Sequence, residues 1–173
     1  MNGSVRHPVI SVKWSRRYSL WSEWETLSKY WPNPGIYVVC RRRPLRRLGG
    51  VDPAGVLYVG KSSHVARRLQ QFVNRQHPAS DYLCHHLPMA RQVLGHDTRT
   101  VTQAERSLEY LLVRVATVIP HKHLDTAEQA VLFAYLYQFG EVPPLNRCLP
   151  GRWGGKVPSA LRAWGGLGIQ CGA

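Results

Sequence analysis

Six side chains in the sequence are of types that could together hydrolyse a phosphate ester: Tyr37, Tyr58, Lys61, Arg68, Glu128 and Asn146. Such a reaction needs a water molecule made nucleophilic, charge neutralisation on the non-bridging oxygens and stabilisation of the departing oxygen. One carboxylate can hold a hydrated Mg²⁺, and an arginine can grip phosphate oxygens with two N–H groups at once. These residue types therefore fit metal-assisted cleavage of a phosphodiester, provided that the fold brings them together.

Two short apolar runs would position the tyrosines. Residues 35–40 follow a Pro-Asn-Pro-Gly turn and are rich in β-branched and aromatic residues, which predicts a buried strand. Residues 55–60 have the same character, and the simplest arrangement pairs the two runs as an antiparallel hairpin. Tyr37 and Tyr58 then lie at equivalent ends of paired strands, so that both hydroxyls can converge on one phosphate.

A helix should follow the second strand. Val65, Leu69 and Phe72 have helical spacing, and Ser62 or Ser63 can cap the helix. Residues 81–94 predict a further helix.

The later part of the sequence completes the expected sheet. Residues 111–119, closed by Pro120, form a third β-rich run. Asp125 or Thr126 can cap the next helix, which runs to Phe139 and ends at Gly140. The expected class is therefore α/β, more narrowly α+β, with a small three-stranded, mostly antiparallel sheet flanked by helices.

Composition divides the chain into three parts. Residues 1–34 are a basic, aromatic-rich extension, helical around 20–30, and most of its aromatic side chains should pack into the core. Residues 35–147 form that core. Residues 148–173 are a Gly-rich, basic tail packed on the core or extending from it.

The segment from 35 to about 146 resembles the GIY-YIG nucleases. Gly35-Ile36-Tyr37 and Tyr58-Val59-Gly60 match the two strand motifs that name this family, with a valine in place of the middle isoleucine of the second motif. The match is specific because further residues follow in the family's order: Lys61, Arg68, Glu128 and the Asn146 of Pro-Pro-Leu-Asn.

The resemblance implies a metal-dependent DNA endonuclease with a GIY-YIG nuclease-like fold. It also implies that Glu128 binds one Mg²⁺ or Mn²⁺ ion per site and that Tyr37 acts as general base or orients the water. A phenol with a pKa of about 10 needs a nearby cation to act as a base at neutral pH, and Lys61 or the metal could supply it. Lys61 is a second candidate base, and Asn146 is expected to fix the late loop or to contact the substrate.

Two features depart from the family's pattern. Phe72 stands where many members have a histidine or tyrosine, so the proton path is open: His64, His77 or Lys61 could compensate, or the chain could be a noncatalytic copy. The second departure is an insertion between the paired strands, which carries five arginines between positions 41 and 47.

The charge balance predicts a polyanionic partner, because 23 Lys and Arg against 10 Asp and Glu give a net charge of +13. We expect DNA contacts from the inserted loop and from the helix after it. The residues assigned to these contacts are Arg41, Arg42, Arg43, Arg46, Arg47, Arg67 and Arg75. The plainer alternatives are a solvated charge run, or a ribosome-like or merely basic binding protein.

The sequence favours a cytoplasmic protein without membrane contact. No apolar stretch approaches the roughly 20 residues that cross a bilayer, and the first residues lack the apolar core of a signal peptide. The four cysteines are scattered and are expected to be free thiols. Cys84-His85-His86 and His121-Lys122-His123 match no strong zinc signature, so no metal is expected there.

Three functions remain open from the sequence. The first is a double-strand DNA endonuclease of the restriction type, which by resemblance leaves a 5′-phosphate and a 3′-hydroxyl; with one site per chain it would act as a homodimer, at least transiently on DNA. The second is a structure- or single-strand-selective nuclease of repair, recombination or mobile elements. The third is a noncatalytic, basic DNA-binding module.

Overall fold

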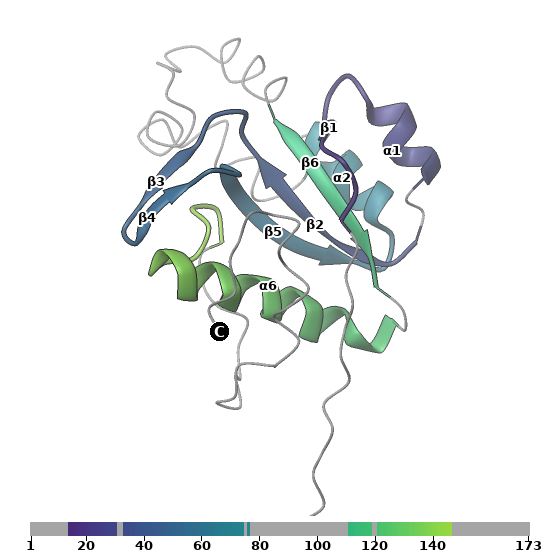
Figure 1. Ribbon diagram of the computed structural model, residues 1–173. Helices are drawn as coiled ribbons and strands as arrows, with labels where there is room; N and C mark the ends of the chain where they lie inside the picture. Colours follow the sequence, from purple (N-terminus) through teal and green to yellow (C-terminus); the bar gives the residue numbers. More distant parts are fainter. Residues whose placement is uncertain (1–13, 31–32, 75, 77–110, 119–120, 147–173) are drawn as a thin grey trace, which may run out of the picture.

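The computed structural model describes residues 14–30, 33–74, 76, 111–118 and 121–146 of the chain (Figure 1). Several expectations fall outside these residues: the helix over 81–94, the tail over 148–173, and the assignments of Arg75, His77 and Cys84-His85-His86.

The main sheet is antiparallel and has four strands rather than the expected three. Its strands are β1 (Tyr18–Ser19), β2 (Gly35–Cys40), β5 (Val56–Ser62) and β6 (Leu112–Thr117), in the order β1-β6-β2-β5. The expected hairpin is confirmed, since β2 and β5 pair directly. The strand that the sequence did not predict is β1, whose Tyr18 pairs with Val113. Two residues are too short a run to show alternation.

Helices cover both faces of this sheet, and the α+β class is confirmed (Figure 1). One face packs against α1 (Trp24–Tyr30) and α2 (Val65–Val73). The other packs against α6 (Leu124–Phe139), which a short 3-10 turn, η1 (His121–His123), precedes.

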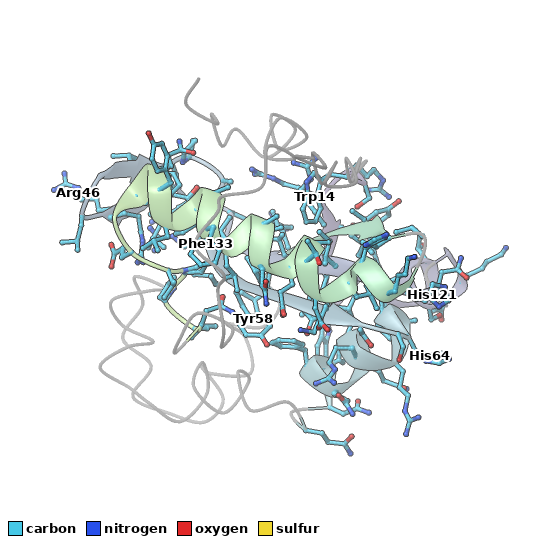
Figure 2. All side chains as sticks on the ribbon, turned by 90° about the horizontal axis from the view of Figure 1, so that it is seen from below. Trp14, Arg46, Tyr58, His64, His121 and Phe133 are labelled. Atoms are coloured by element: carbon cyan, nitrogen blue, oxygen red, sulfur yellow. The ribbon has the colours of Figure 1, made fainter. Side chains whose placement is uncertain are left out.

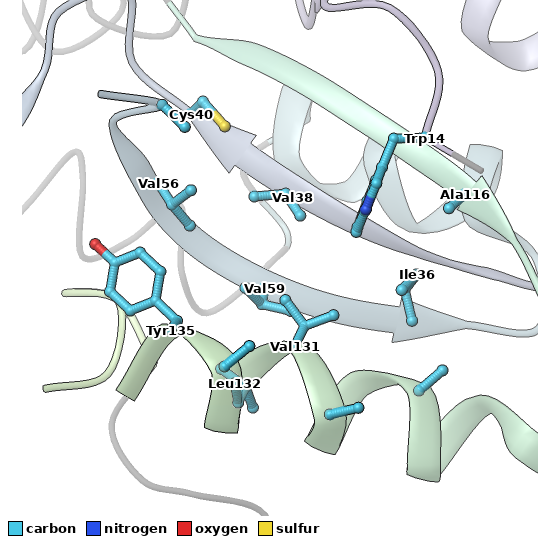
Figure 3. Packing of buried hydrophobic residues seen from close by; sticks show 14 of the residues in the cluster. Trp14, Ile36, Val38, Cys40, Val56, Val59, Ala116, Val131, Leu132 and Tyr135 are labelled. Carbon is cyan, nitrogen blue, oxygen red and sulfur yellow. The ribbon is translucent and has the colours of Figure 1, made fainter. Parts of the chain in front are cut away.

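Alternation along β2 separates the two halves of the core. Ile36, Val38 and Cys40 pack toward α6 together with Trp14 from the extension, as Figure 3 shows. Tyr37 and Val39 belong to the opposite cluster, with the side chains of α1 and α2. Because neighbouring side chains of a strand point to opposite faces, Tyr37 must face α2 if Ile36 faces α6.

The two helix starts differ from the expected ones. His64 is the N-cap of α2, and the Ser62 hydroxyl instead accepts a hydrogen bond from the His64 N–H at 3.0 Å. His123, rather than Asp125 or Thr126, is the N-cap of α6, because the chain enters this helix from η1. The predicted end at Gly140 is confirmed, with a left-handed φ of 72°.

The inserted arginine-rich segment is a second sheet rather than a loop. β3 (Leu45–Arg47) and β4 (Gly50–Asp52) form a two-stranded hairpin. Buried Asp52 fixes its base, because its carboxylate accepts hydrogen bonds from the N–H groups of Ala54, Gly55 and Val56. The Tyr135 hydroxyl of α6 donates a further one at 3.0 Å.

The extension is continuous with the core in the structure. Trp14 is 9% exposed, Leu20 and Leu27 are buried, and the Ser15 backbone N–H donates a hydrogen bond to the Val115 carbonyl at 2.8 Å. Trp21 is an exception to the expected packing, since it is 49% exposed. None of the described helices combines the length and the apolar character needed to cross a membrane.

Candidate active site

The candidate site lies along β5, the edge strand of the sheet, between α2 on one face and α6 on the other. Three aromatic rings form its floor. The ring centroids of Tyr37 and Tyr58 are 6.1 Å apart, and Phe72 of α2 lies 6.1 Å from Tyr37 and 5.8 Å from Tyr58. Phe72 is fully buried, so it acts as a wall for the two phenols.

The glycines of both strand motifs have packing reasons. A Cβ on Gly60 would lie 2.5 Å from the Tyr37 hydroxyl oxygen, so only glycine lets this phenol cross β5. A Cβ on Gly35 would lie 2.4 Å from the Ala116 carbonyl oxygen of β6. Glycine at these two motif positions therefore lets a side chain or a backbone carbonyl approach the strand closely.

The two phenols differ in exposure and share a hydrogen bond. Tyr37 is 1% exposed, whereas Tyr58 is partly exposed. Burial, followed by the effect of Tyr58, raises the pKa of Tyr37 well above its ordinary value. Burial, followed by the charge of Glu128, also raises the pKa of Tyr58, although its hydrogen bond with Tyr37 lowers that pKa. The hydrogen bond raises the pKa of Tyr37 and lowers that of Tyr58, which corresponds to Tyr37 as the donor and the Tyr58 oxygen as the acceptor.

Lys61 joins the strand to α6 through two carboxylates. Its Nζ lies 2.6 Å from Glu128 Oε2 and 2.6 Å from Asp125 Oδ1. Partial burial opposes the charge, but the hydrogen bonds to Asp125 and Glu128 outweigh it, so the pKa of Lys61 is raised. A protonated lysine cannot accept a proton, and this geometry favours Lys61 as a fixed cation over its alternative as a base.

Arg68 approaches the phenols from α2. Its charge lowers the pKa of Tyr37 and Tyr58 while that of Glu128 raises both, which puts the guanidinium and the carboxylate within electrostatic reach of the same two hydroxyls. Within the described ranges, Arg68 forms no ion pair. A half-buried cation that pairs with no acid of the described residues is suited to bind an incoming phosphate.

Glu128 is the acid best placed to hold a metal. Its side chain is 14% exposed, and while Oε2 binds Lys61, Oε1 accepts no hydrogen bond from the described residues. Across the described part of the chain, no group of three or more His, Cys, Asp or Glu residues could hold an ion. Mg²⁺ keeps several of its waters, so a single carboxylate whose second oxygen is not used by the described residues fits that ion.

Asn146 lies at the outer edge of β5 and has a clear structural task. Its Oδ1 accepts a hydrogen bond from the Val59 N–H at 2.9 Å, and its Nδ2 donates one to the Val59 carbonyl at 2.8 Å. The neighbouring Leu145 N–H donates to the Leu57 carbonyl at 2.9 Å. Both ends of the amide are thus used to hold the late loop on the strand, which favours the first of its two expected roles.

The arginines assigned to DNA binding fall into two groups. Arg41 donates hydrogen bonds to the carbonyls of Arg43 and Pro44, and Arg47 is 8% exposed and pairs with Glu141 at 3.1 Å. These two arginines are used within the protein. Exposed positions are Arg42, Arg43, Arg46 and Arg67.

Two acids that matter in the structure were not assigned to any site from the sequence. Asp125 was expected to cap a helix, yet it shares Lys61 with Glu128, and the separation of three positions on one helix is the signal that could have identified it. Asp52 has local partners in the backbone of 54–56, which a turn sequence could have indicated, but its partner Tyr135 is 83 positions away and becomes a neighbour only when the hairpin folds onto α6.

Comparisons with protein families, with curated proteins and with solved structures found no match to this chain.

Proposed function

We propose that this protein is a metal-dependent DNA endonuclease of the GIY-YIG type. The observation that carries the proposal is the meeting of Tyr37, Tyr58, Lys61, Arg68 and Glu128 along one edge strand, although they come from two strands and two helices. Coincidence accounts poorly for such a convergence, because the residues are up to 91 positions apart and were selected from the sequence alone.

The side chains divide the work on a phosphodiester. Arg68 binds the non-bridging oxygens and neutralises the charge that grows on them. The Tyr58 hydroxyl, oriented by its hydrogen bond from Tyr37, directs its own proton toward the attacking water or the phosphate. Lys61 holds Glu128 and adds a second positive charge.

A divalent ion fits the free oxygen of Glu128, and Mg²⁺ or Mn²⁺ bound there would supply Lewis-acid neutralisation of the phosphate. The reaction itself is a hydrolysis. The water oxygen forms a bond to phosphorus as the bond to the 3′ oxygen breaks, the water loses a proton, and the 3′ oxygen gains one. The products are a 5′-phosphate and a 3′-hydroxyl. Solvent can carry these protons, and exposed His64 is the candidate among the described residues.

The test is cleavage of plasmid DNA by the purified protein with Mg²⁺ or Mn²⁺. We expect Glu128→Gln and Arg68→Ala to lower the cleavage rate at least about 100-fold, the usual cost of removing one transition-state contact. Circular dichroism should stay unchanged. Glu25→Gln, on the exposed surface of α1, is the matched control and should cut normally. Full activity in either site variant would reject the assigned site.

The same cleavage assay identifies which form of DNA is the substrate. Duplex, branched and single-stranded oligonucleotides distinguish a restriction-type enzyme from a structure- or single-strand-selective one. We propose duplex DNA, since the exposed arginines lie on the hairpin as well as next to the site on α2.

A second candidate is a noncatalytic DNA-binding module, and Phe72 favours it. A buried phenylalanine occupies the position from which a proton could be transferred, and the raised pKa values of both phenols keep them neutral. Equal DNA binding by wild type and Glu128→Gln, with no cleavage under any metal, would select this alternative.

A further inference from the structure

We propose that the β3–β4 hairpin, with the segment 41–44 that leads into it, is a rigid contact to duplex DNA, in which Arg42, Arg43 and Arg46 bind phosphates and Leu48 at the tip reaches the bases. The inference deepens the proposed function and depends on it only for the choice of DNA as the polyanion. Figure 2 shows Arg46 at one end of the molecule, with Tyr58 of the candidate site nearer the middle.

The exposed charge of the hairpin has one sign. Positions 41–51 contain no acidic residue, and Asp52 is buried and hydrogen-bonded. Arg46 pairs across the hairpin with Val51, so the two side chains share its outer face, and both are exposed. An element whose free charges are all guanidinium groups attracts phosphates and repels none.

The hairpin is held in place by its inner side. The Gly49 N–H donates to the Phe139 carbonyl at 2.8 Å, and the Leu48 N–H donates to Glu141 Oε1 at 2.9 Å. Arg47 pairs with the same glutamate. An element fixed before binding loses little conformational freedom on contact, which favours affinity.

α6 sets the distance between the hairpin and the site. Glu128 lies in its first half, and Phe139 at its end supports the tip. At a rise of 1.5 Å per residue this separation is about 16 Å. It corresponds to roughly five base pairs of duplex, at 3.4 Å each.

The tip itself is apolar. Leu48 is 83% exposed and Val51 57% exposed. A two-stranded ribbon fits the major groove of a duplex, where apolar side chains contact thymine methyl groups, and leucine is among the side chains that enter base steps from the minor groove. An exposed leucine two positions from the exposed Arg46 is therefore suited to contact DNA.

The first test measures duplex binding by the full chain in EDTA as salt is varied. Replacing Arg42, Arg43 and Arg46 together by Ala should reduce the steepness of log affinity against log salt by up to about 2.7. The control replaces exposed Arg17, Lys29 and Lys122 by Ala, which removes the same charge from other surfaces. We expect the control to leave the slope near that of wild type. Equal effects of the two variants would overturn the proposal, because binding would then follow net charge alone.

The second test examines Leu48 with duplexes that carry a fluorescent base analogue. Wild type should change the analogue's emission at positions about five base pairs from the cut, and Leu48→Ala should lose this change. If Leu48→Ala instead abolishes self-association in ultracentrifugation and leaves emission unchanged, the tip belongs to a dimer interface and its DNA role is rejected. A protein that cuts no DNA but shows the expected slopes would reject the nuclease and keep the hairpin contact.

Discussion

At the scale of single residues, the two tyrosines show how context changes chemistry. By resemblance Tyr37 was the expected general base or water orienter, but in the structure Tyr37 is buried whereas Tyr58 is partly exposed. Gly60 makes the arrangement possible by leaving room for the Tyr37 hydroxyl. We therefore assign Tyr37 to positioning and Tyr58 to the substrate side of the proposed site.

The raised pKa values predict a loss of stability at alkaline pH. Unfolded phenols ionise at a pH of about 10, while Tyr37, Tyr58 and Tyr135 ionise later in the folded protein. Above that pH the unfolded state has released more protons, so the free energy of unfolding falls as pH rises. Below it, these phenols contribute no pH dependence.

This loss is measurable by urea unfolding at a series of pH values, with phenolate absorbance followed in parallel. Tyr37→Phe should weaken the dependence above a pH of about 10, since one buried phenol is removed. Phenolate absorbance that rises fully at that pH in the folded protein would contradict the burial of these groups.

At the scale of elements, the arginine-rich insertion differs most from expectation. A charged run between two strands is typical of a solvated loop, yet Asp52 and the four residues that it binds make it a packed hairpin. Its carboxylate satisfies three backbone N–H groups and joins the hairpin to α6 through Tyr135.

Asp52→Ala should lower the free energy of unfolding by about 3 kcal/mol or more, because buried N–H groups lose their acceptor. Tyr135→Phe should cost less, about 1–2 kcal/mol, since it removes one hydrogen bond. Urea unfolding measures both costs, and Glu25→Ala, at an exposed position of α1, is the control. A cost for Asp52→Ala no larger than that of the control would show that the carboxylate does not hold the hairpin.

At the scale of the whole molecule, one proposed site per chain meets a substrate with two strands. Cutting both strands of a duplex therefore needs two copies of the protein or two successive binding events of one copy. We expect supercoiled plasmid to be nicked first at low protein concentration and to become linear in one step at high concentration.

Gel analysis of plasmid products over a range of protein concentrations checks this expectation, with sedimentation in the presence of DNA as a second measurement. Product ratios that do not vary with concentration would indicate that single chains cut independently.

The sequence alone determined the α+β class, the pairing of β2 with β5, the presence of a strand within 111–119 and the helix ending at Gly140, because these depend on local periodicity and turn residues. The sequence also selected the residues of the candidate site, because the motifs of the family that it resembles follow in the same order along the chain. Only the tertiary structure decided that two residues of the extension form a fourth strand, that Asp125 shares Lys61 with Glu128, and that Arg47 pairs with Glu141. Those outcomes depend on partners distant along the chain, and burial and pairing between such partners leave no periodic signal in a single sequence.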